Sequence, residues 1–293
     1  MAQITEIFDK AKKLFDNGDL NNGYTVKGGR IFHTYYTNHE WNEYVDTMPK
    51  AIKDQFDKGK GGEMKEYTRN GKTYPPKMAS YGSSSRFMIS IGQSINGFEY
   101  EKQLQTGLGG YPANLDGYLK EKCIYVEAKC HEFYNYSRPS VREGHKKLLD
   151  GIKPLLNGKL NYIIQNEKLY LSWNDKDTGH FDLKQMLCHL SGIANAVLND
   201  EVVKKVNFIY LIYSPSEVLL NFVENESYKQ IIKELYEEEE TFIQTIDFKS
   251  IYGAILNYFN KERYSDKEIS EMLSSFNFIF CTQDNFKTIV DNL

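Results

Sequence analysis

Residues 98–130 of this chain read FEYEKQLQTGLGGYPANLDGYLKEKCIYVEAKC, and apolar side chains recur there at about every second position. A period of two is typical of β-strands. A glycine-rich turn at 107–110 and the polar Lys120–Lys122 divide the segment into three strand-like runs, at 98–104, 112–119 and 123–130. Short connections favour antiparallel neighbours, so the sequence predicts a three-stranded antiparallel meander.

Outside the meander, most segments have the hydrophobic period of helices. Helices are predicted over 1–20, 40–58, 138–150, 182–199, 224–245, 248–260 and 266–274. Three apolar runs predict further strands at 160–173, 206–213 and 276–281, and the Gly- and Lys-rich residues 58–77 predict a loop. The run at 206–213 is continuously apolar, as in a strand that is covered on both faces.

No repeat or Pro/Ser-rich linker divides the chain of 293 residues. We therefore expect one α/β domain over 1–293, with a core at about 83–213 and helical extensions at 1–80 and 216–293.

Three chemically active side chains lie on the last two strands of the meander. Alternation along 124–129 places Glu127 and Lys129 on one face, about 6.6 Å apart, opposite a face of apolar residues. The preceding strand carries Asp116. A short hairpin would lay Asp116 beside Glu127, so two carboxylates and one ammonium group are expected to converge.

This combination suits the hydrolysis of phosphodiester bonds. Mg²⁺ or Mn²⁺ takes hard oxygen ligands and is commonly held by one or two carboxylates together with a substrate phosphate. Asp116 and Glu127 are the predicted metal ligands. Lys129 would stabilise charge on the phosphate, or orient and help to deprotonate the attacking water.

The segment Pro112–Asp116, eleven residues before Glu127-Ala128-Lys129, resembles the signature of the PD-(D/E)XK nuclease superfamily, which includes many restriction endonucleases. Over about residues 83–213, the chain also resembles a narrower group, a bacterial branch of restriction-endonuclease-like proteins. The segments that carry this resemblance are Ser83–Ser85, Phe98–Glu101, the glycine-rich turn, Glu127–Lys129 followed by Glu132, and Gln185–His189. The resemblance implies a mixed central β-sheet flanked by helices. It also implies a metal-dependent DNA endonuclease of a restriction or genome-defence system, with a homodimer as the expected assembly.

The chain departs from the superfamily pattern in one respect. Many members carry a further glutamate on the helix before the first strand, whereas Ser85–Ile95 contains no acid. Glu99 or Glu101 could supply it, since both lie on one face of the first strand. We favour Glu101 as the third metal ligand and as a catalytic residue.

Substrate contacts are expected from two helical segments. Gln185 and His189 share a helix face, being four residues apart. Arg138 and Arg142 belong to a basic cluster that suits phosphate contacts. For His189 a buried structural role is the alternative, and for the basic cluster a solvated helix face.

Composition narrows the partners and the location. Residues 1–160 hold 24 Lys and Arg against 19 Asp and Glu, whereas residues 161–293 hold 12 against 21. The candidate site thus lies in the more basic half, which suits nucleic acid, with DNA as the expected partner. No apolar run approaches the ~20 residues that span a bilayer, so we expect a cytoplasmic protein without a membrane partner. The four cysteines form no C-x-x-C pair, so a zinc cage is not predicted.

Other interpretations stay open at this level. Asp116 could be a turn residue before Gly117, with Glu127 and Lys129 as an exposed ion pair. The fold could survive as a catalytically inactive nucleic-acid-binding or protein-interaction module. A glycosidase using Glu101 and Glu127 would leave Lys129 without a role. The sequence gives neither the target site nor a preference for DNA over RNA.

Overall fold

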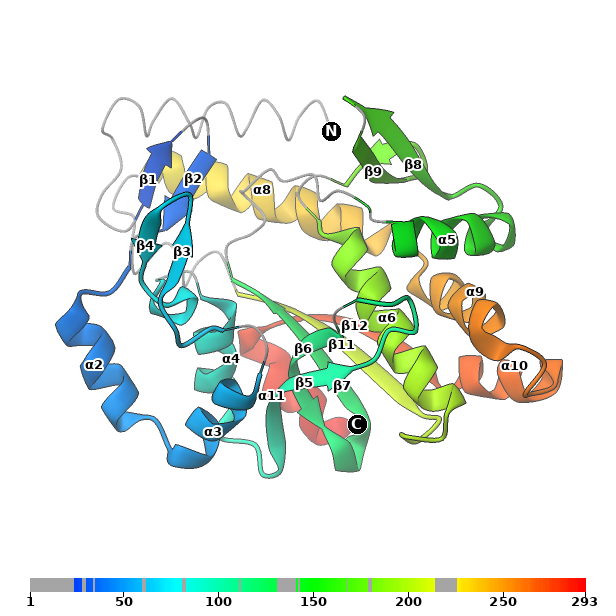
Figure 1. The fold of residues 1–293 in the computed structure, drawn as a ribbon, viewed down its shortest axis with the longest axis horizontal. Helices are drawn as coiled ribbons and strands as arrows, with labels where there is room; N and C mark the ends of the chain where they lie inside the picture. Colours follow the sequence, from blue (N-terminus) through cyan, green and yellow to red (C-terminus); the bar gives the residue numbers. More distant parts are fainter. Residues whose placement is uncertain are drawn as a thin grey trace.

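A mixed sheet of five strands is the centre of the protein in the computed structural model (Figure 1). Its spatial order is β12-β11-β7-β6-β5, formed by Phe276–Thr282, Val206–Ile212, Ile124–Lys129, Ala113–Leu119 and Phe98–Leu104. The structure describes residues 24–27, 30–33, 35–59, 62–80, 83–110, 112–130, 141, 143–166, 168–178, 181–213 and 226–293.

Strand pairing follows the predicted meander. β5 and β6 are antiparallel, as are β6 and β7, and β11 then runs parallel to both β7 and β12. Every residue of β11 is buried, which agrees with its uninterrupted apolar sequence. The expected α/β class and mixed central sheet are therefore confirmed.

Helices cover both faces of this sheet (Figure 1). The α-helices are α2 (Asn38–Thr47), α3 (Lys50–Lys58), α4 (Ser84–Gly92), α5 (Glu143–Ile152), α6 (Leu183–Leu198), α8 (Glu226–Gln244), α9 (Phe248–Asn260), α10 (Asp266–Ser274) and α11 (Gln283–Asn292). Short 3₁₀ turns occur at Lys77–Ala79, Lys120–Lys122 and Lys153–Leu156. Among the described residues, no helix has the length and apolarity that crossing a bilayer requires.

Within the described ranges, three small sheets accompany the central one. They are the hairpin β1 (Tyr24–Lys27) with β2 (Arg30–His33), the hairpin β3 (Tyr67–Arg69) with β4 (Lys72–Tyr74), and the sheet of β8 (Leu160–Gln165), β9 (Lys168–Trp173) and β10 (Lys176–Asp177). The apolar run predicted at 160–173 is thus a hairpin rather than one strand.

The buried apolar residues that the structure describes form two hydrophobic clusters, on opposite sides of the sheet. The α6-side cluster includes Tyr125 and Phe208, together with apolar residues of α6 and α9. The α4-side cluster includes Val126 and Ile209, with residues of α3, α4 and α11. Because β7 is a central strand, both of its faces are covered, and Glu127 lies on a buried face.

Strands β5 and β6 change faces near Glu101. Tyr100 belongs to the α4-side cluster and Leu104 to the α6-side cluster, although an unbroken strand would point both to one side. Glu101 has a φ of 54°, a left-handed conformation that is costly for a residue with a side chain. The pairing of β5 with β6 is recorded on either side of Glu101 and Asp116 but not between them. The two acids therefore lie together where the ladder is interrupted.

Several predicted boundaries need correction. The helix predicted over 40–58 is two helices, α2 and α3, because Pro49 cannot continue the first. Part of the loop predicted at 58–77 forms the hairpin β3–β4, so the extension at 1–80 is not wholly helical. The core also extends beyond 213, since β12 belongs to the central sheet. The helix predicted over 1–20 lies outside the described residues.

Replacing Gly117 with Ala is expected to destabilise the protein by about 1–3 kcal/mol. A β-carbon there would lie 2.7 Å from Cε1 of Phe98 and 3.3 Å from Cβ of Val126, too close for van der Waals contact. Urea unfolding measures the loss. When Gly117→Ala is combined with Phe98→Leu, the loss in free energy of unfolding should be smaller than the sum of the losses of the two single variants. Losses that simply add would contradict a direct clash between the two side chains.

Candidate active site

Asp116 is held against β7 where that strand separates from β6. The last ladder pair of the two strands is Gly117 with Val126. Beyond it, Oδ2 of Asp116 accepts a hydrogen bond of 2.8 Å from the backbone amide of Ala128. The carboxylate thus takes the place of a ladder acceptor, which fixes it next to Glu127 and Lys129 in the chain. The sequence prediction that Asp116 lies beside this strand is confirmed.

Glu127 and Lys129 form a largely buried ion pair. Nζ of Lys129 lies 2.5 Å from Oε1 of Glu127, and the two side chains are 13% and 1% exposed. The same ammonium group donates a hydrogen bond of 2.7 Å to Oε1 of Gln185 in the first turn of α6. Because two acceptors orient this ammonium group, it differs from the mobile charge of an exposed lysine.

His189 lies behind the ion pair. The next turn of α6 places its Nδ1 3.2 Å from Oε2 of Glu127, a close approach without hydrogen-bond geometry. Burial, and after it the charge of Lys129, lower the pKa of His189 to about 3, so the imidazole is neutral near pH 7. The ring is 2% exposed, so it lies next to Glu127 in the interior and does not face solvent.

Glu101 completes a group of acids at the interrupted ladder. Burial raises its pKa from the ordinary 4.5 to about 8, and the charges of Asp116, Glu63 and Glu127 add to the shift, with Lys77 opposing it. Glu99, the other candidate, is instead 46% exposed and lies 3.7 Å from the ammonium group of Lys102. Of the two acids, Glu101 is the one on which the charges of Asp116 and Glu127 act.

Sequence reasoning missed Glu63. It follows α3 in a Gly- and Lys-rich segment and forms an ion pair of 3.1 Å with Lys77. The hydroxyl of Ser85, at the start of α4, lies 3.4 Å from its other carboxylate oxygen. The helix before β5 carries no acid, and Glu63 approaches Ser85 on that helix from an earlier loop. No local pattern marks this residue.

Glu101 can be reached from the side of α3. An open pocket of about 500 Å³ is bordered by Gln55, Lys58 and Gly59 of the α3 region and by Glu101. A β-carbon at Gly59 would lie 3.2 Å from Oε2 of Glu101, so the small residue leaves room beside that carboxylate. The predicted phosphate contacts Arg138 and Arg142 lie outside the described residues.

The donor set suits a divalent cation. Within the described part of the chain, no three His, Cys, Asp or Glu side chains form a preassembled metal cluster. Burial is the main cause of the raised pKa of Glu101, and repulsion from the carboxylates of Asp116, Glu63 and Glu127 adds to it. A hard cation such as Mg²⁺ or Mn²⁺ would relieve that repulsion with the oxygen ligands that it prefers. Asp116, Glu101 and Glu127 are the residues that would hold it.

The stability of the metal-free protein is expected to fall between about pH 4.5 and pH 8 through Glu101. Its folded-state pKa of about 8 exceeds the ordinary 4.5, so the folded protein holds the proton more tightly. That contribution is full below about pH 4.5 and is lost as the pH rises through about 8.

Urea unfolding in EDTA at several pH values measures this loss. Since Glu239 is also buried with a pKa raised to about 8, the informative quantity is the difference between wild type and Glu101→Gln. Between about pH 4.5 and pH 8, the free energy of unfolding of this variant should fall by on the order of 2–4 kcal/mol less than that of wild type. Identical profiles for the two proteins would contradict the assignment.

Comparison of the chain with family models, curated proteins and solved structures finds no match.

Proposed function

We propose that this protein is a divalent-metal-dependent endonuclease that hydrolyses phosphodiester bonds in DNA. The observation that carries the proposal is the meeting of Asp116, Glu101 and the Glu127–Lys129 pair at one interruption of the sheet. Structural ion pairs are common, but a buried pair beside two further acids is costly to fold and is typical of functional sites.

Each residue has a distinct role in this proposal. Asp116, Glu101 and Glu127 hold the cation, which when bound would neutralise phosphate charge and lower the pKa of water. Lys129 lies at the edge of the acid group with its ammonium hydrogens directed by Glu127 and Gln185. From there it donates a hydrogen bond to a phosphate oxygen, and its charge stabilises the additional negative charge of the transition state.

Gln185 and His189 act on these residues and not on DNA. Gln185 limits the orientations of the Lys129 ammonium group, and α6 holds Gln185 through a hydrogen bond of 2.8 Å from its backbone amide to Asp182. His189 fills the space behind Glu127 as a neutral ring. A neutral ring there adds no positive charge that would compete with a cation for Glu127.

The test is incubation of purified protein with supercoiled plasmid DNA and either Mg²⁺, Mn²⁺ or EDTA. Nicked or linear plasmid should appear with the cations and not with EDTA. A parallel incubation with single-stranded RNA shows whether the activity is restricted to DNA. If the plasmid stays intact in both cations while calorimetry detects no carboxylate-dependent binding of Mn²⁺, the proposal fails and an inactive binding module becomes the better interpretation.

A further inference from the structure

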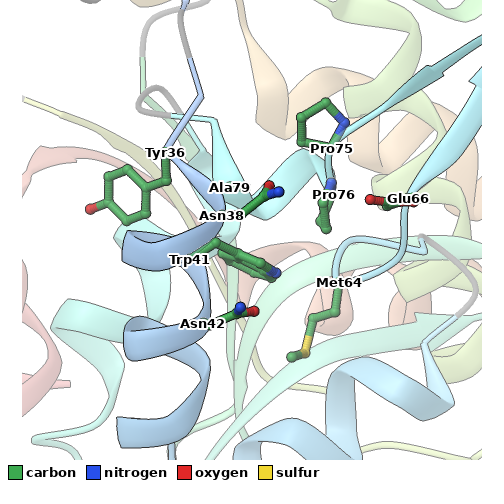
Figure 2. Close-up of a pocket in the computed structure, with 9 residues that line it drawn as sticks. All are labelled: Tyr36, Asn38, Trp41, Asn42, Met64, Glu66, Pro75, Pro76 and Ala79. Atoms are coloured by element: carbon green, nitrogen blue, oxygen red, sulfur yellow. The ribbon is translucent and has the colours of Figure 1, made fainter.

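A second pocket lies between α2 and the segment that runs from Met64 to Ala79. Its volume is about 340 Å³, which falls in the range of sites for small ligands. Figure 2 shows the indole of Trp41 projecting from α2 toward Pro76 and Met64 on the other side. An aromatic ring, a proline ring and a thioether therefore form the apolar walls of a slot.

Polar groups stand at the edges of this slot. Asn38 and Asn42 are one turn apart on α2, and Figure 2 shows their amides on either side of Trp41. Glu66 lies across the pocket from the helix. All three residues are exposed, so their donors and acceptors are available to a ligand. Apolar faces with polar edges match a flat heteroaromatic ring that carries hydrogen-bonding groups on its rim.

The walls are fixed before any ligand arrives. α2 begins with a capping box in which Thr37 and Glu40 bond reciprocally. The ring of Trp41 packs against that of Tyr44 at a centroid distance of 5.9 Å. The opposite wall is stiff because consecutive Pro75 and Pro76 have restricted backbone angles. A preorganised slot loses little entropy when it binds a ring.

One short segment connects the pocket to the acids. Glu63, whose charge contributes to the raised pKa of Glu101, immediately precedes Met64 of the pocket wall. The backbone carbonyl of Glu63 accepts a hydrogen bond of 2.9 Å from the amide of Met78, which ties this segment to the turn after Pro76. The pocket wall is therefore continuous in the chain with an acid whose charge acts on Glu101.

We propose that the Trp41 pocket binds one unstacked nucleobase of the substrate strand. The base inserts between Trp41 and the Pro76–Met64 wall, and Asn38, Asn42 and Glu66 bond to its edge. Stacking and edge contacts of this kind recognise bases that lie outside a duplex. The inference rests on the proposed function for its substrate class, and it adds a recognition site to the cleavage site.

Fluorescence anisotropy with short labelled single strands tests this in EDTA, where no cleavage can occur. Two probes are compared: an oligodeoxycytidine and an abasic strand of the same length. Wild-type protein should bind the base-bearing strand more tightly than the abasic one, and the strand should quench the fluorescence of Trp41. The other tryptophan, Trp173, is 1% exposed and contributes little to the quenching.

Variants of the pocket sharpen the test. Trp41→Ala should weaken binding of the base-bearing strand by roughly 5- to 150-fold. Asn42→Ala, on an exposed helix position, should weaken it by roughly fivefold without affecting folding. Asn96→Ala removes an exposed amide elsewhere and should bind as wild type does. Neither pocket variant should change affinity for the abasic strand.

Equal affinity for the two strands, or pocket variants that bind the base-bearing strand as wild type does, would overturn the inference. Its failure is distinguishable from failure of the proposed function, because anisotropy requires no catalysis. Base-dependent binding by a protein that neither cleaves plasmid nor binds Mn²⁺ through its carboxylates would keep the pocket and reject the nuclease. Plasmid cleavage together with base-independent binding would keep the nuclease and reject the pocket.

Discussion

Asp116→Asn is expected to reduce plasmid cleavage by about 100- to 1000-fold, the size of effect that follows loss of one group that stabilises a transition state. Asn retains an oxygen that can accept the 2.8 Å hydrogen bond from Ala128, so the backbone of β7 stays in place. What disappears is the negative charge that would hold a cation. The free energy of unfolding should change by less than about 1 kcal/mol.

Two comparisons separate charge from structure in this experiment. Asp116→Ala removes the acceptor as well and should lose stability in addition to activity. Glu99→Gln neutralises a carboxylate of the same strand pair that is 46% exposed and faces Lys102, so cleavage should persist. An active Asp116→Asn enzyme would remove the central acid from the mechanism.

Lys129→Met is expected to lower cleavage by about 100-fold or more and to destabilise the protein by about 2–4 kcal/mol. Met preserves most of the aliphatic chain but leaves Glu127, which is 1% exposed, without its ammonium partner. Cleavage assays and urea unfolding of the same preparation measure the two effects.

A double-mutant cycle with Glu127→Gln distinguishes the structural from the catalytic loss. With both charges removed, no uncompensated buried ion remains, so the Glu127→Gln and Lys129→Met double variant should recover much of the stability. Its cleavage activity should not recover, because both the cation ligand and the phosphate donor are missing. Stabilities that simply add would show that the pair is not coupled, contrary to its 2.5 Å geometry.

The central sheet was predictable because its strands carry local signals. The alternation in 98–130 and the continuous apolar run at 206–213 survive as β5, β6, β7 and β11. The parallel pairing of β11 with β7 and β12 was not predictable, because the local sequence of a strand does not determine which other strands it pairs with. The hairpin β3–β4 was missed because its three-residue strands are too short to show a period.

The candidate site was predictable where its residues lie on neighbouring strands. Asp116, Glu127 and Lys129 are related by one hairpin. Gln185 was expected to contact substrate, and its hydrogen bond with Lys129 follows from the packing of α6 against the sheet. Glu63 depends on how a glycine-rich loop returns to the sheet. The left-handed conformation of Glu101 is equally hidden, because Glu has no intrinsic preference for it. Both are set by tertiary packing.

Anomalous diffraction from a crystal soaked in Mn²⁺ tests the central claim most directly. We expect a single strong peak within coordination distance of carboxylate oxygens from Asp116 and Glu101, with Glu127 turned toward it, and no such peak in crystals of Asp116→Asn. Carboxylates that keep their metal-free positions, with no peak among them at a Mn²⁺ concentration that supports cleavage, would contradict it.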